Sequence, residues 1–367
     1  MRIVCTVTND LAQDQRMDRI CTSLVRAGHE VTLVGRLLPD SKPLPDKGYR
    51  QHRIRCRHHG GKRFYAEYNY RLVREIKGWS YDAVCAVDLD TLLAGVRLTA
   101  GGRAKLVFDA HEWFSETPEV VGRPLVRGLW RGLGKALVPK TDARYTVAPM
   151  LAERLAEDYG VPFRTVRNLP SPAPASPPEK PDYLPRTDRK VILYQGMLNP
   201  GRGLPTAINA LGGLPACDLW LVGSGPEENA LRILAEKAGV ADRVWFAGFR
   251  PPPELPAITA RAWLGLNLLD AVSPSYYYSL ANKSLDYVQA GLPSVQMDFP
   301  EYVALQKQYG CFLLIDRLEP VRLGIAVSRL LENEKEHEAL RRGCDIAAKQ
   351  LTWEQEEVEL LDIWKNL

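Results

Sequence analysis

The feature that most constrains the fold is an alternation that the sequence repeats twice: a short apolar run, a turn, and a segment with apolar residues at helical spacing. Each apolar run is continuous rather than alternating, which is typical of strands buried on both faces of a parallel sheet. The runs lie at 3–7, 31–34, 83–87, 105–108 and 145–147, and then at 191–194, 219–222, 244–246, 264–268 and 294–296. The pattern predicts an α/β fold with two Rossmann-like, doubly wound domains facing a cleft, with ligands at the carboxyl ends of the strands.

A proline-rich segment separates the two sets of strands. Seven prolines lie between Asn168 and Lys190. Proline removes a backbone donor and fixes φ, so this segment continues neither a helix nor a central strand. The 367 residues also exceed the roughly 250–300 at which one core stops growing. We therefore expect an N-terminal domain over 1–167, a linker over 168–190, a second domain over 191–349, and a C-terminal helix over 350–367 that packs back toward the first domain.

Composition restricts the class of protein. The seven cysteines are scattered without zinc-ligand spacing, and the sequence shows neither a basic leader nor an apolar run of about 18 residues. We expect a cytoplasmic protein without a metal site. Residues 1–170 hold 28 Lys and Arg against 19 Asp and Glu (+9), whereas residues 171–367 hold 20 against 25 (−5). The basic half indicates an anionic partner, and because no nucleic-acid-binding motif accompanies it, nucleic acid is not expected.

Glycine-rich turns follow two strands of the second half. In "VILYQGMLNPGRG", Gly196 and Gly203 leave the backbone bare on either side of Arg202. Backbone N–H groups, the start of a helix and a guanidinium together favour an anion, although a solvated arginine in a loop is the alternative. The second turn, "LVGSGPEEN" with Gly223, lacks the third glycine of a dinucleotide fingerprint, and a tight strand-to-helix turn explains it equally well.

A third candidate is the segment "SPSYYYSLANKSLDYVQAGLP". Asn282 is expected to cap a helix that begins near Lys283. A lysine at that end opposes the helix dipole, which is tolerable where an anion is recruited to the same place. Asp286 lies one turn further on the same face, within reach of groups beyond the anion. An ordinary surface ion pair between Lys283 and Asp286 is the alternative.

In the first half, "DAHE" places His111 and Glu112 at a strand end. Either they contact a substrate or His111 is a hydrogen-bonded core histidine beside solvated acids. Asp14 and Arg16 follow the first strand and are candidate acceptor-side contacts, although surface exposure explains them equally well.

The stretch 121–140 contains no acidic residue. As a helix it places a set of apolar residues on one face and three basic residues on the other, which is typical of a helix that docks on anionic lipid. The apolar residues are Leu125, Val126, Leu129, Trp130, Leu133 and Leu137, and the basic ones are Arg127, Arg131 and Lys135. The alternative is that this apolar face covers the sheet.

Taken in order, these motifs resemble family 4 glycosyltransferases. The donor-domain likeness is carried by the Gly196–Gly203 loop, "LVGSGPE", "RVWFAGF" and the helix that ends in "AGLP". The acceptor-domain likeness is carried by "TNDLAQDQRMDRICTSLVRAGHEVTLVGR", "VDLDTLL", "KLVFDAHEWFSE" and "TDARYTVAPMLAERLAEDYGV". The resemblance covers nearly the whole chain and implies the GT-B fold and retention of anomeric configuration.

The resemblance also implies roles for individual residues. Arg202 matches a lysine that holds the donor diphosphate, and Gly196 opens the same loop. Asp286 matches the second glutamate of a Glu-x7-Glu motif that binds ribose hydroxyls. His111 matches a histidine that approaches the donor sugar. Two further donor-site residues, at the position that contacts the base, are Phe249 and Arg250.

The chain departs from the family pattern at two further positions. Met197 stands where many members have a second phosphate-binding arginine, and Tyr278 replaces the first glutamate of Glu-x7-Glu. Lys283 is expected to supply the charge of the missing arginine.

The expected function is transfer of a sugar from a nucleotide-diphosphate sugar to a saccharide or lipid-linked acceptor, without a metal ion or other cofactor. Contact with an anionic membrane through 121–140 is expected at the periphery of the inner face. Two alternatives remain: a sugar-nucleotide 2-epimerase of the same fold, and an inactive nucleotide-sugar-binding scaffold.

Overall fold

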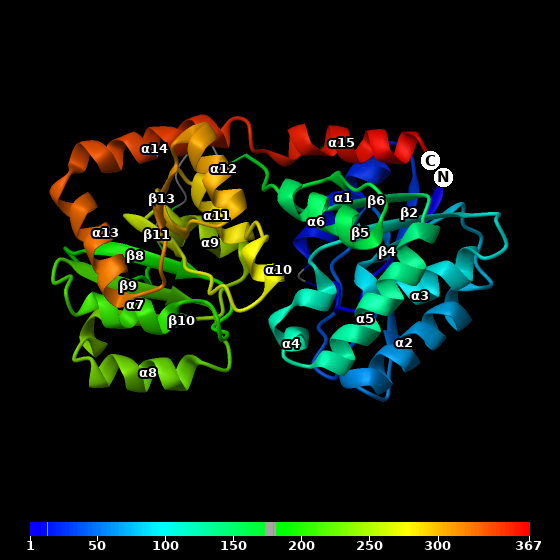
Figure 1. Ribbon diagram of the computed structural model, residues 1–367, viewed down its shortest axis with the longest axis horizontal. Coiled ribbons are helices and arrows are strands. Elements are labelled where there is room, and N and C mark those ends of the chain that lie inside the picture. Colours follow the sequence, from blue (N-terminus) through cyan, green and yellow to red (C-terminus); the bar gives the residue numbers. More distant parts are fainter. Residues whose placement is uncertain (13, 173–178, 180) are drawn as a thin grey trace. The chain divides into compact units, whose positions relative to one another are not determined.

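The computed structural model describes residues 1–12, 14–172, 179 and 181–367 (Figure 1). The chain forms two compact units. Unit 1 consists of Met1–Asn168 and Glu354–Leu367, and unit 2 consists of Leu169–Trp353. Part of the expected linker, residues 173–178 and 180, lies outside the described residues.

The core of unit 1 is a seven-stranded parallel sheet of order β3-β2-β1-β4-β5-β6-β7. Its strands are β1 (Arg2–Thr6), β2 (Glu30–Leu37), β3 (Arg50–Arg55), β4 (Ala83–Val87), β5 (Lys105–Ala110), β6 (Ala143–Thr146) and β7 (Arg164–Thr165). The apolar runs predicted β1, β2, β4, β5 and β6. They did not predict β3, because this edge strand is polar, or β7, because it has only 2 residues.

Helices cover both faces of this sheet (Figure 1). They are α1 (Gln15–Arg26), α2 (Gly61–Ile76), α3 (Asp88–Thr99), α4 (Pro118–Val121), α5 (Pro124–Leu137), α6 (Pro149–Tyr159) and the C-terminal α15 (Trp353–Lys365), with 3₁₀ turns at Phe114–Glu116 and Val138–Lys140. The side of α2 that faces the sheet is apolar, and Phe64, Tyr68 and Leu72 pack there on Val4 and Val34.

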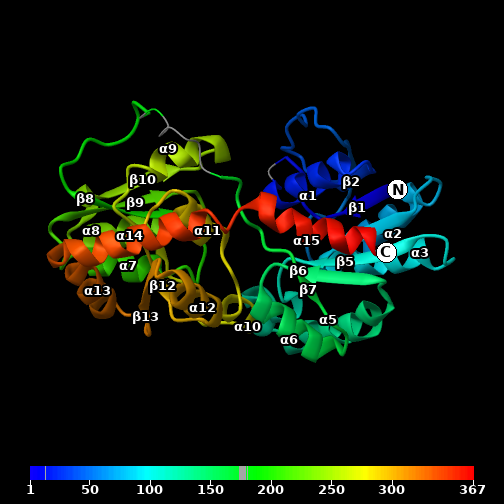
Figure 2. The same cartoon turned by 90° about the horizontal axis from the view of Figure 1, so that it is seen from above.

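The predicted return of the C-terminal helix is confirmed, because α15 packs within unit 1. Glu357 accepts a hydrogen bond from Ser23 of α1 at 2.6 Å, and Glu356 accepts one from the guanidinium of Arg167 at 2.7 Å. Trp364 is buried against the unit. Figure 2 shows α15 along unit 1, with both chain ends on that unit.

Unit 2 holds a six-stranded parallel sheet of order β10-β9-β8-β11-β12-β13. The strands are β8 (Lys190–Gln195), β9 (Cys217–Val222), β10 (Val244–Gly248), β11 (Leu264–Asn267), β12 (Ser294–Met297) and β13 (Phe312–Ile315). All but β13 were predicted. The helices are α7 (Leu204–Leu211), α8 (Glu228–Lys237), α9 (Leu255–Thr259), α10 (Pro274–Tyr277), α11 (Asn282–Gln289), α12 (Pro300–Tyr309), α13 (Pro320–Glu332) and α14 (Glu334–Ala348), with 3₁₀ turns at Ala241–Arg243 and Pro252–Glu254.

The helices of unit 2 also form two layers. α7, α8 and α13 lie on one side of the sheet and α9, α11, α12 and α14 on the other (Figure 1). The order 3-2-1-4-5-6 counted from β8 reverses direction between β8 and β11, and such a reversal is where doubly wound sheets bind ligands. The predicted α/β fold with two doubly wound sheets is therefore confirmed. Among the described residues, no helix is both long and apolar enough to cross a bilayer.

Candidate active site

The turns that follow β8 and β9 bring their bare backbones together. Gly196 has φ 140° and donates its N–H to the carbonyl of Val222 at 2.9 Å. A Cβ on Gly223, which has φ 142°, would lie 1.9 Å from the carbonyl oxygen of Gly196. Only glycine allows this approach and these dihedrals. The two glycine-rich turns therefore form one surface of open backbone at the carboxyl edge of the sheet.

The predicted cation on the first turn lies directly before α7. Gly203 occupies the N-cap position with φ 66°, and a Cβ there would lie 2.5 Å from Leu268 at the end of β11. Arg202 is half-buried, and its guanidinium carbon lies 4.7 Å from the ring centroid of Tyr276. The aromatic face holds the planar cation beside the N-terminus of α7, where the helix dipole favours an anion.

Lys283 of α11 reaches the same turn. A Cβ on Gly196 would lie 3.5 Å from its Nζ, and this Nζ lies 4.9 Å from the ring centroid of Tyr194. Burial, and then the positive charge of Arg202, lower the pKa of Lys283 to about 7, against a smaller raising effect of Asp286. Two cations far apart in the sequence thus act on each other at one place. Their mutual repulsion is relieved when an anion binds between them.

Asp286 lies one turn along α11 from Lys283. Its Oδ2 is 3.5 Å from Nε2 of Gln195, the last residue of β8, and the amide oxygen of Gln195 accepts a hydrogen bond from Thr259 at 2.9 Å. The carboxylate is half-buried at the same strand end as the glycine turn. Its oxygens are hydrogen-bond acceptors beside that turn.

The prediction that Asn282 caps α11 is wrong. Ala281 occupies the N-cap position without a side-chain cap, and Asn282 is the first helical residue with an exposed side chain. The backbone N–H of Ala281 instead donates to the hydroxyl of Tyr302 at 3.0 Å, and this contact fixes the start of the helix. Tyr278 ends α10 and packs edge-on against Tyr277, with ring centroids 5.0 Å apart.

Phe249 and Arg250 follow β10. Phe249 is 54% exposed, which suits a residue that meets a planar ligand. Arg250 already interacts with two other residues, because its guanidinium lies 4.0 Å from the ring centroid of Tyr183 and 3.8 Å from the carboxylate of Glu254. The structure therefore gives Phe249 the freer side chain of the two predicted base contacts.

In unit 1 the predicted His111 belongs to a buried ionic chain. Its Nε2 lies 3.1 Å from Oδ2 of Asp109, and the other oxygen of Asp109 accepts a hydrogen bond from Arg16 at 2.8 Å. Burial alone lowers the pKa of His111, but the charge of Asp109 and its hydrogen bond outweigh this effect and raise the pKa to about 8. His111 is half-buried, and its raised pKa favours the charged imidazolium form at neutral pH.

The alternative that Arg16 is a solvent-exposed side chain is wrong. Arg16 lies in the first turn of α1, is 4% exposed, and also donates to the carbonyl of Val166 at 2.8 Å. Its guanidinium orients Asp109 and, through it, His111. Asp14 is likewise structural, because it is the N-cap of α1 and accepts hydrogen bonds from the N–H of Met17 at 2.9 Å and from Asn9 at 2.5 Å.

Sequence reasoning did not identify two acids beside His111. Asp88 begins α3 with φ 57°, and its carboxylate accepts a hydrogen bond from the N–H of His111 at 2.8 Å. Asp90 is 6% exposed and accepts a hydrogen bond from Thr8 at 2.7 Å. Burial is the main cause that raises the pKa of Asp88 to about 6 and of Asp90 to about 7. A non-glycine residue at positive φ marks strain that functional sites often retain.

Glu112 completes this group. Glu112 is exposed to solvent, and partial desolvation and the negative charges of Asp88 and Glu119 raise the pKa of its carboxyl group. Among the described residues, no cluster of His, Cys, Asp and Glu has the arrangement of a metal site. The carboxylates and the imidazole are groups that form hydrogen bonds with hydroxyl groups.

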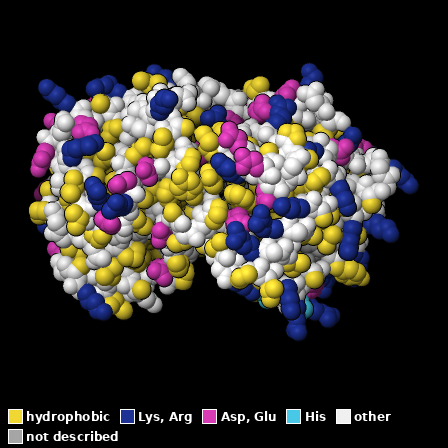
Figure 3. Space-filling model, in the orientation of Figure 1, with side chains coloured by type: hydrophobic (Ala, Val, Ile, Leu, Met, Phe, Trp, Pro, Cys, Tyr) yellow, Lys and Arg dark blue, Asp and Glu magenta, His cyan; other side chains and the backbone are white. Residues whose placement is uncertain are grey.

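The helix in 121–140 differs from its prediction. α5 buries Trp130 and Leu137, whereas Leu125 and Leu129 are 91% and 67% exposed. The apolar residues are therefore divided between the interior and the surface. Arg127 and Arg131, expected on the face opposite the apolar residues, pair with Glu116 at 2.5 Å and Asp158 at 3.0 Å. Lys and Arg side chains are nevertheless numerous over α4 and α5 (Figure 3).

Two family models match consecutive parts of the chain. Residues 14–172 match the model "Glycosyltransferase Family 4", and residues 189–333 match "Glycosyl transferases group 1". The lipopolysaccharide core biosynthesis glycosyltransferase LpsD of Rhizobium meliloti is 26% identical over 54% of this chain. That alignment spans 55% of the relative, so the chain matches about half the length of LpsD.

Solved structures share the fold across the chain. Sucrose-phosphate synthase from Thermosynechococcus elongatus superposes with a TM-score of 0.80 at 16% identity, covering 100% of this chain and 98% of that one. Anabaena HepE in complex with UDP-glucose gives a TM-score of 0.77 at 14% identity and covers 100% of both chains. These likenesses show the two-domain fold.

Proposed function

The chain belongs to the family 4, group 1 glycosyltransferases, and from that premise we propose that it transfers a sugar from a nucleotide-diphosphate sugar to a saccharide or lipid-linked acceptor. The observation that carries the proposal is the placement of Arg202 and Lys283 at the glycine turn after β8, where the charge of one lowers the pKa of the other. Relatives named for lipopolysaccharide core biosynthesis and a neighbour that holds UDP-glucose support this class of donor and acceptor.

The proposed mechanism assigns the two cations to the leaving group. As the bond between the sugar and the diphosphate breaks, negative charge grows on the diphosphate oxygens. Fixed cations and the N-terminus of α7 stabilise this charge more in the transition state than in the ground state. Asp286 binds the ribose hydroxyls, Phe249 meets the base, and the acceptor binds to unit 1 near His111. Because Arg202 and Lys283 supply the positive charge, the reaction requires no divalent metal ion.

The test is a transfer assay with a panel of UDP- and GDP-sugars and lipid-linked or core-saccharide acceptors. Release of the nucleotide diphosphate is expected to require an acceptor and to persist in EDTA. Arg202→Gln is expected to lower kcat/KM roughly 10- to 100-fold, because it removes one charge-assisted hydrogen bond to the leaving group. Arg322→Gln, which removes an exposed arginine of α13, is the matched control and should leave the rate unchanged.

Three results would contradict the proposal. Conversion of a donor to its epimer without any acceptor would identify the 2-epimerase. Donor binding without turnover on any acceptor would identify the scaffold. Loss of all activity in EDTA, restored by Mg²⁺, would exclude the metal-independent mechanism.

We further propose that α5 docks unit 1 on an anionic membrane. Leu125 and Leu129 lie one turn apart on its surface, beside the exposed Arg123, and Lys135 and Lys140 are exposed at the far end. Insertion of two leucines and attraction of the bases to anionic lipid act together. Such docking would bring a lipid-linked acceptor to unit 1.

Leu125→Ser with Leu129→Ser is expected to weaken binding to vesicles of phosphatidylglycerol and phosphatidylcholine at least about tenfold, since each leucine contributes roughly 1.5–3 kcal/mol when buried. Vesicle co-sedimentation measures this partition. The control is Val321→Ser with Ile325→Ser on α13, where two apolar residues of the same spacing are 70% and 61% exposed. Equal loss in both double variants would exclude α5 as the docking element.

A further inference from the structure

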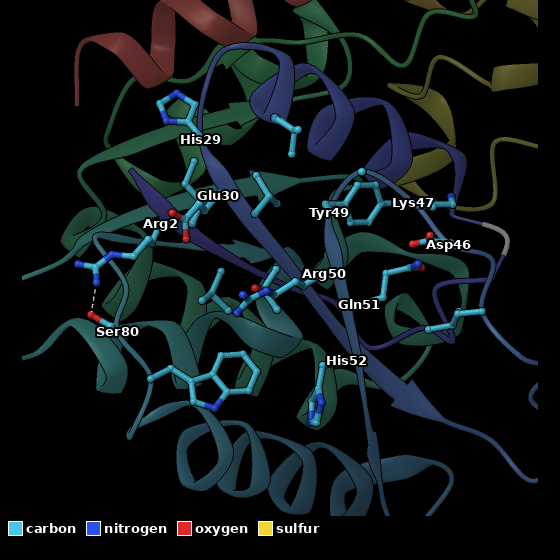
Figure 4. Close-up of a pocket in the computed structure, with 18 of the residues that line it drawn as sticks. Arg2, His29, Glu30, Asp46, Lys47, Tyr49, Arg50, Gln51, His52 and Ser80 are labelled. Carbon is cyan, nitrogen blue, oxygen red and sulfur yellow. Dashed lines mark hydrogen bonds between the residues drawn. The ribbon is translucent and has the colours of Figure 1, made fainter.

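Unit 1 contains a cavity of about 1200 Å³ that none of the proposed roles uses (Figure 4). It is lined by the first residues of β1, β2 and β3, by the segment before β3, and by Trp79 and Ser80 ahead of β4. His111, in contrast, follows the carboxyl end of β5. Substrates of doubly wound sheets bind at the carboxyl ends of the strands, so a cavity at the amino ends is a separate place.

One cation of the cavity is not engaged by the protein. Arg2 is held by Asp82 at 2.8 Å, and Lys47 is held by Asp18 at 2.7 Å. For the guanidinium of Arg50, the described residues supply neither an ion pair nor a hydrogen bond, and in Figure 4 it lies between Arg2 on one side and Gln51 and His52 on the other. The guanidinium of Arg50 thus presents two parallel N–H donors, which bind a phosphate through two hydrogen bonds.

The second element is the aromatic side chain of Trp79. Trp79 is half-buried against the core beneath α2, and the ring of His52 packs edge-on to it with centroids 5.5 Å apart. His52 is in turn 3.3 Å from Glu75. These contacts hold the indole in one orientation at the cavity, as a flat apolar surface bordered by polar groups.

We propose that this cavity binds a phosphorylated saccharide. The phosphate lies on Arg50, and the apolar face of the sugar ring packs on Trp79. The volume admits more than one sugar ring, because pockets for drug-sized ligands occupy roughly 300–1,000 Å³. The proposal does not depend on the transfer reaction, since all its residues belong to the amino edge of unit 1.

The experiment titrates the full chain with glucose 6-phosphate, glucose and inorganic phosphate, followed by calorimetry and by the fluorescence of tryptophan. Saturable binding of glucose 6-phosphate is expected. Arg50→Gln should weaken it roughly 10- to 100-fold, the range for one charge-assisted contact. Arg55→Gln removes the same charge from the other end of β3 and should have no effect. Trp79→Phe, which preserves the aromatic packing, should weaken the binding less than Arg50→Gln does.

Several outcomes would overturn the proposal. These are absence of saturable binding, equal loss in Arg50→Gln and Arg55→Gln, and binding of inorganic phosphate as tight as that of glucose 6-phosphate. Loss of binding in Arg202→Gln with none in Arg50→Gln would assign the ligand to the site in unit 2. The last outcome leaves the proposed transfer reaction untouched, so failure of one proposal is distinguishable from failure of the other.

Discussion

Lys283→Met is expected to weaken the binding of a nucleoside diphosphate roughly 10- to 100-fold and to lower kcat/KM by at least as much. Methionine keeps most of the length of the side chain and removes its charge. The ammonium lies at the backbone turn of Gly196, and it completes, with Arg202, the positive charge that this place offers. Calorimetric titration with UDP and GDP measures the loss.

The lowered pKa of Lys283 makes the affinity for a nucleoside diphosphate depend on pH. The pKa of Lys283 is lowered to about 7 in the free protein, so the ammonium is fully present only below that pH. A diphosphate binds the ammonium form and raises its pKa again. The affinity is therefore expected to be greatest between about pH 6 and 7, where the ammonium is charged and the terminal phosphate, with a second pKa of about 6, is still largely ionised. It is expected to fall as the pH rises above 7, and binding there is accompanied by proton uptake.

Lys283→Arg is the control for this pH dependence. A guanidinium stays charged over the whole range, so the affinity of this variant for UDP or GDP should be constant between about pH 7 and 9, where the terminal phosphate of the nucleotide, with a second pKa of about 6, stays ionised. Measuring the binding of the nucleotide alone separates this titration from those of His111 and Glu112 in unit 1. An equally steep pH profile in Lys283→Arg and in the wild type would refute the assignment.

Asp109→Asn is expected to give the largest loss of stability. Asp109 is fully buried between Arg16, which is 4% exposed, and His111. The substitution leaves a buried guanidinium without a counter-charge, which costs about 3–5 kcal/mol. Hydrogen exchange of α1 and β5 is expected to show this loss, while the strands of unit 2 serve as the internal reference.

Two further measurements separate the buried charge from general damage. Arg16→Met with Asp109→Asn should be less destabilised than Asp109→Asn alone, because it removes both charges. The raised pKa of His111, about 8, means that its contribution to stability is complete below the unfolded value near 6.5 and is lost as the pH rises through 8. This pH dependence should disappear in Asp109→Asn. A double variant as unstable as the single one would contradict the account.

The alternation of apolar runs was sufficient to predict most of the strands and the turns around Gly196, Arg202 and Gly223. Buried parallel strands are continuous in hydrophobicity, and bare backbone requires glycine, so both leave a local signal. β3 reads "RQHRIR" because an edge strand is half-exposed, and its pairing to β2 depends on tertiary contacts that no local pattern records.

The roles of charged residues were harder to predict than the positions of strands. Arg16 is expected to be exposed from its type alone, and only its contact with Asp109, 93 residues away in the chain, explains its burial. Asp109 lies in β5 and His111 follows the end of that strand two residues later, and this spacing in an extended chain was a signal that could have been used. The helix α5 was predicted, but its single apolar face was not found, and Glu116 and Asp158, which come from other segments, decided where its arginines point.

The most direct test of the central claim is a calorimetric cycle with UDP and GDP on four proteins: the wild type, Arg202→Gln, Lys283→Met and the double variant. If both cations bind one diphosphate, each single variant loses affinity roughly tenfold or more for the same nucleotide, and the losses do not add in the double variant. An unchanged affinity in either single variant would show that the two cations do not serve one diphosphate, and would contradict the assignment of the site.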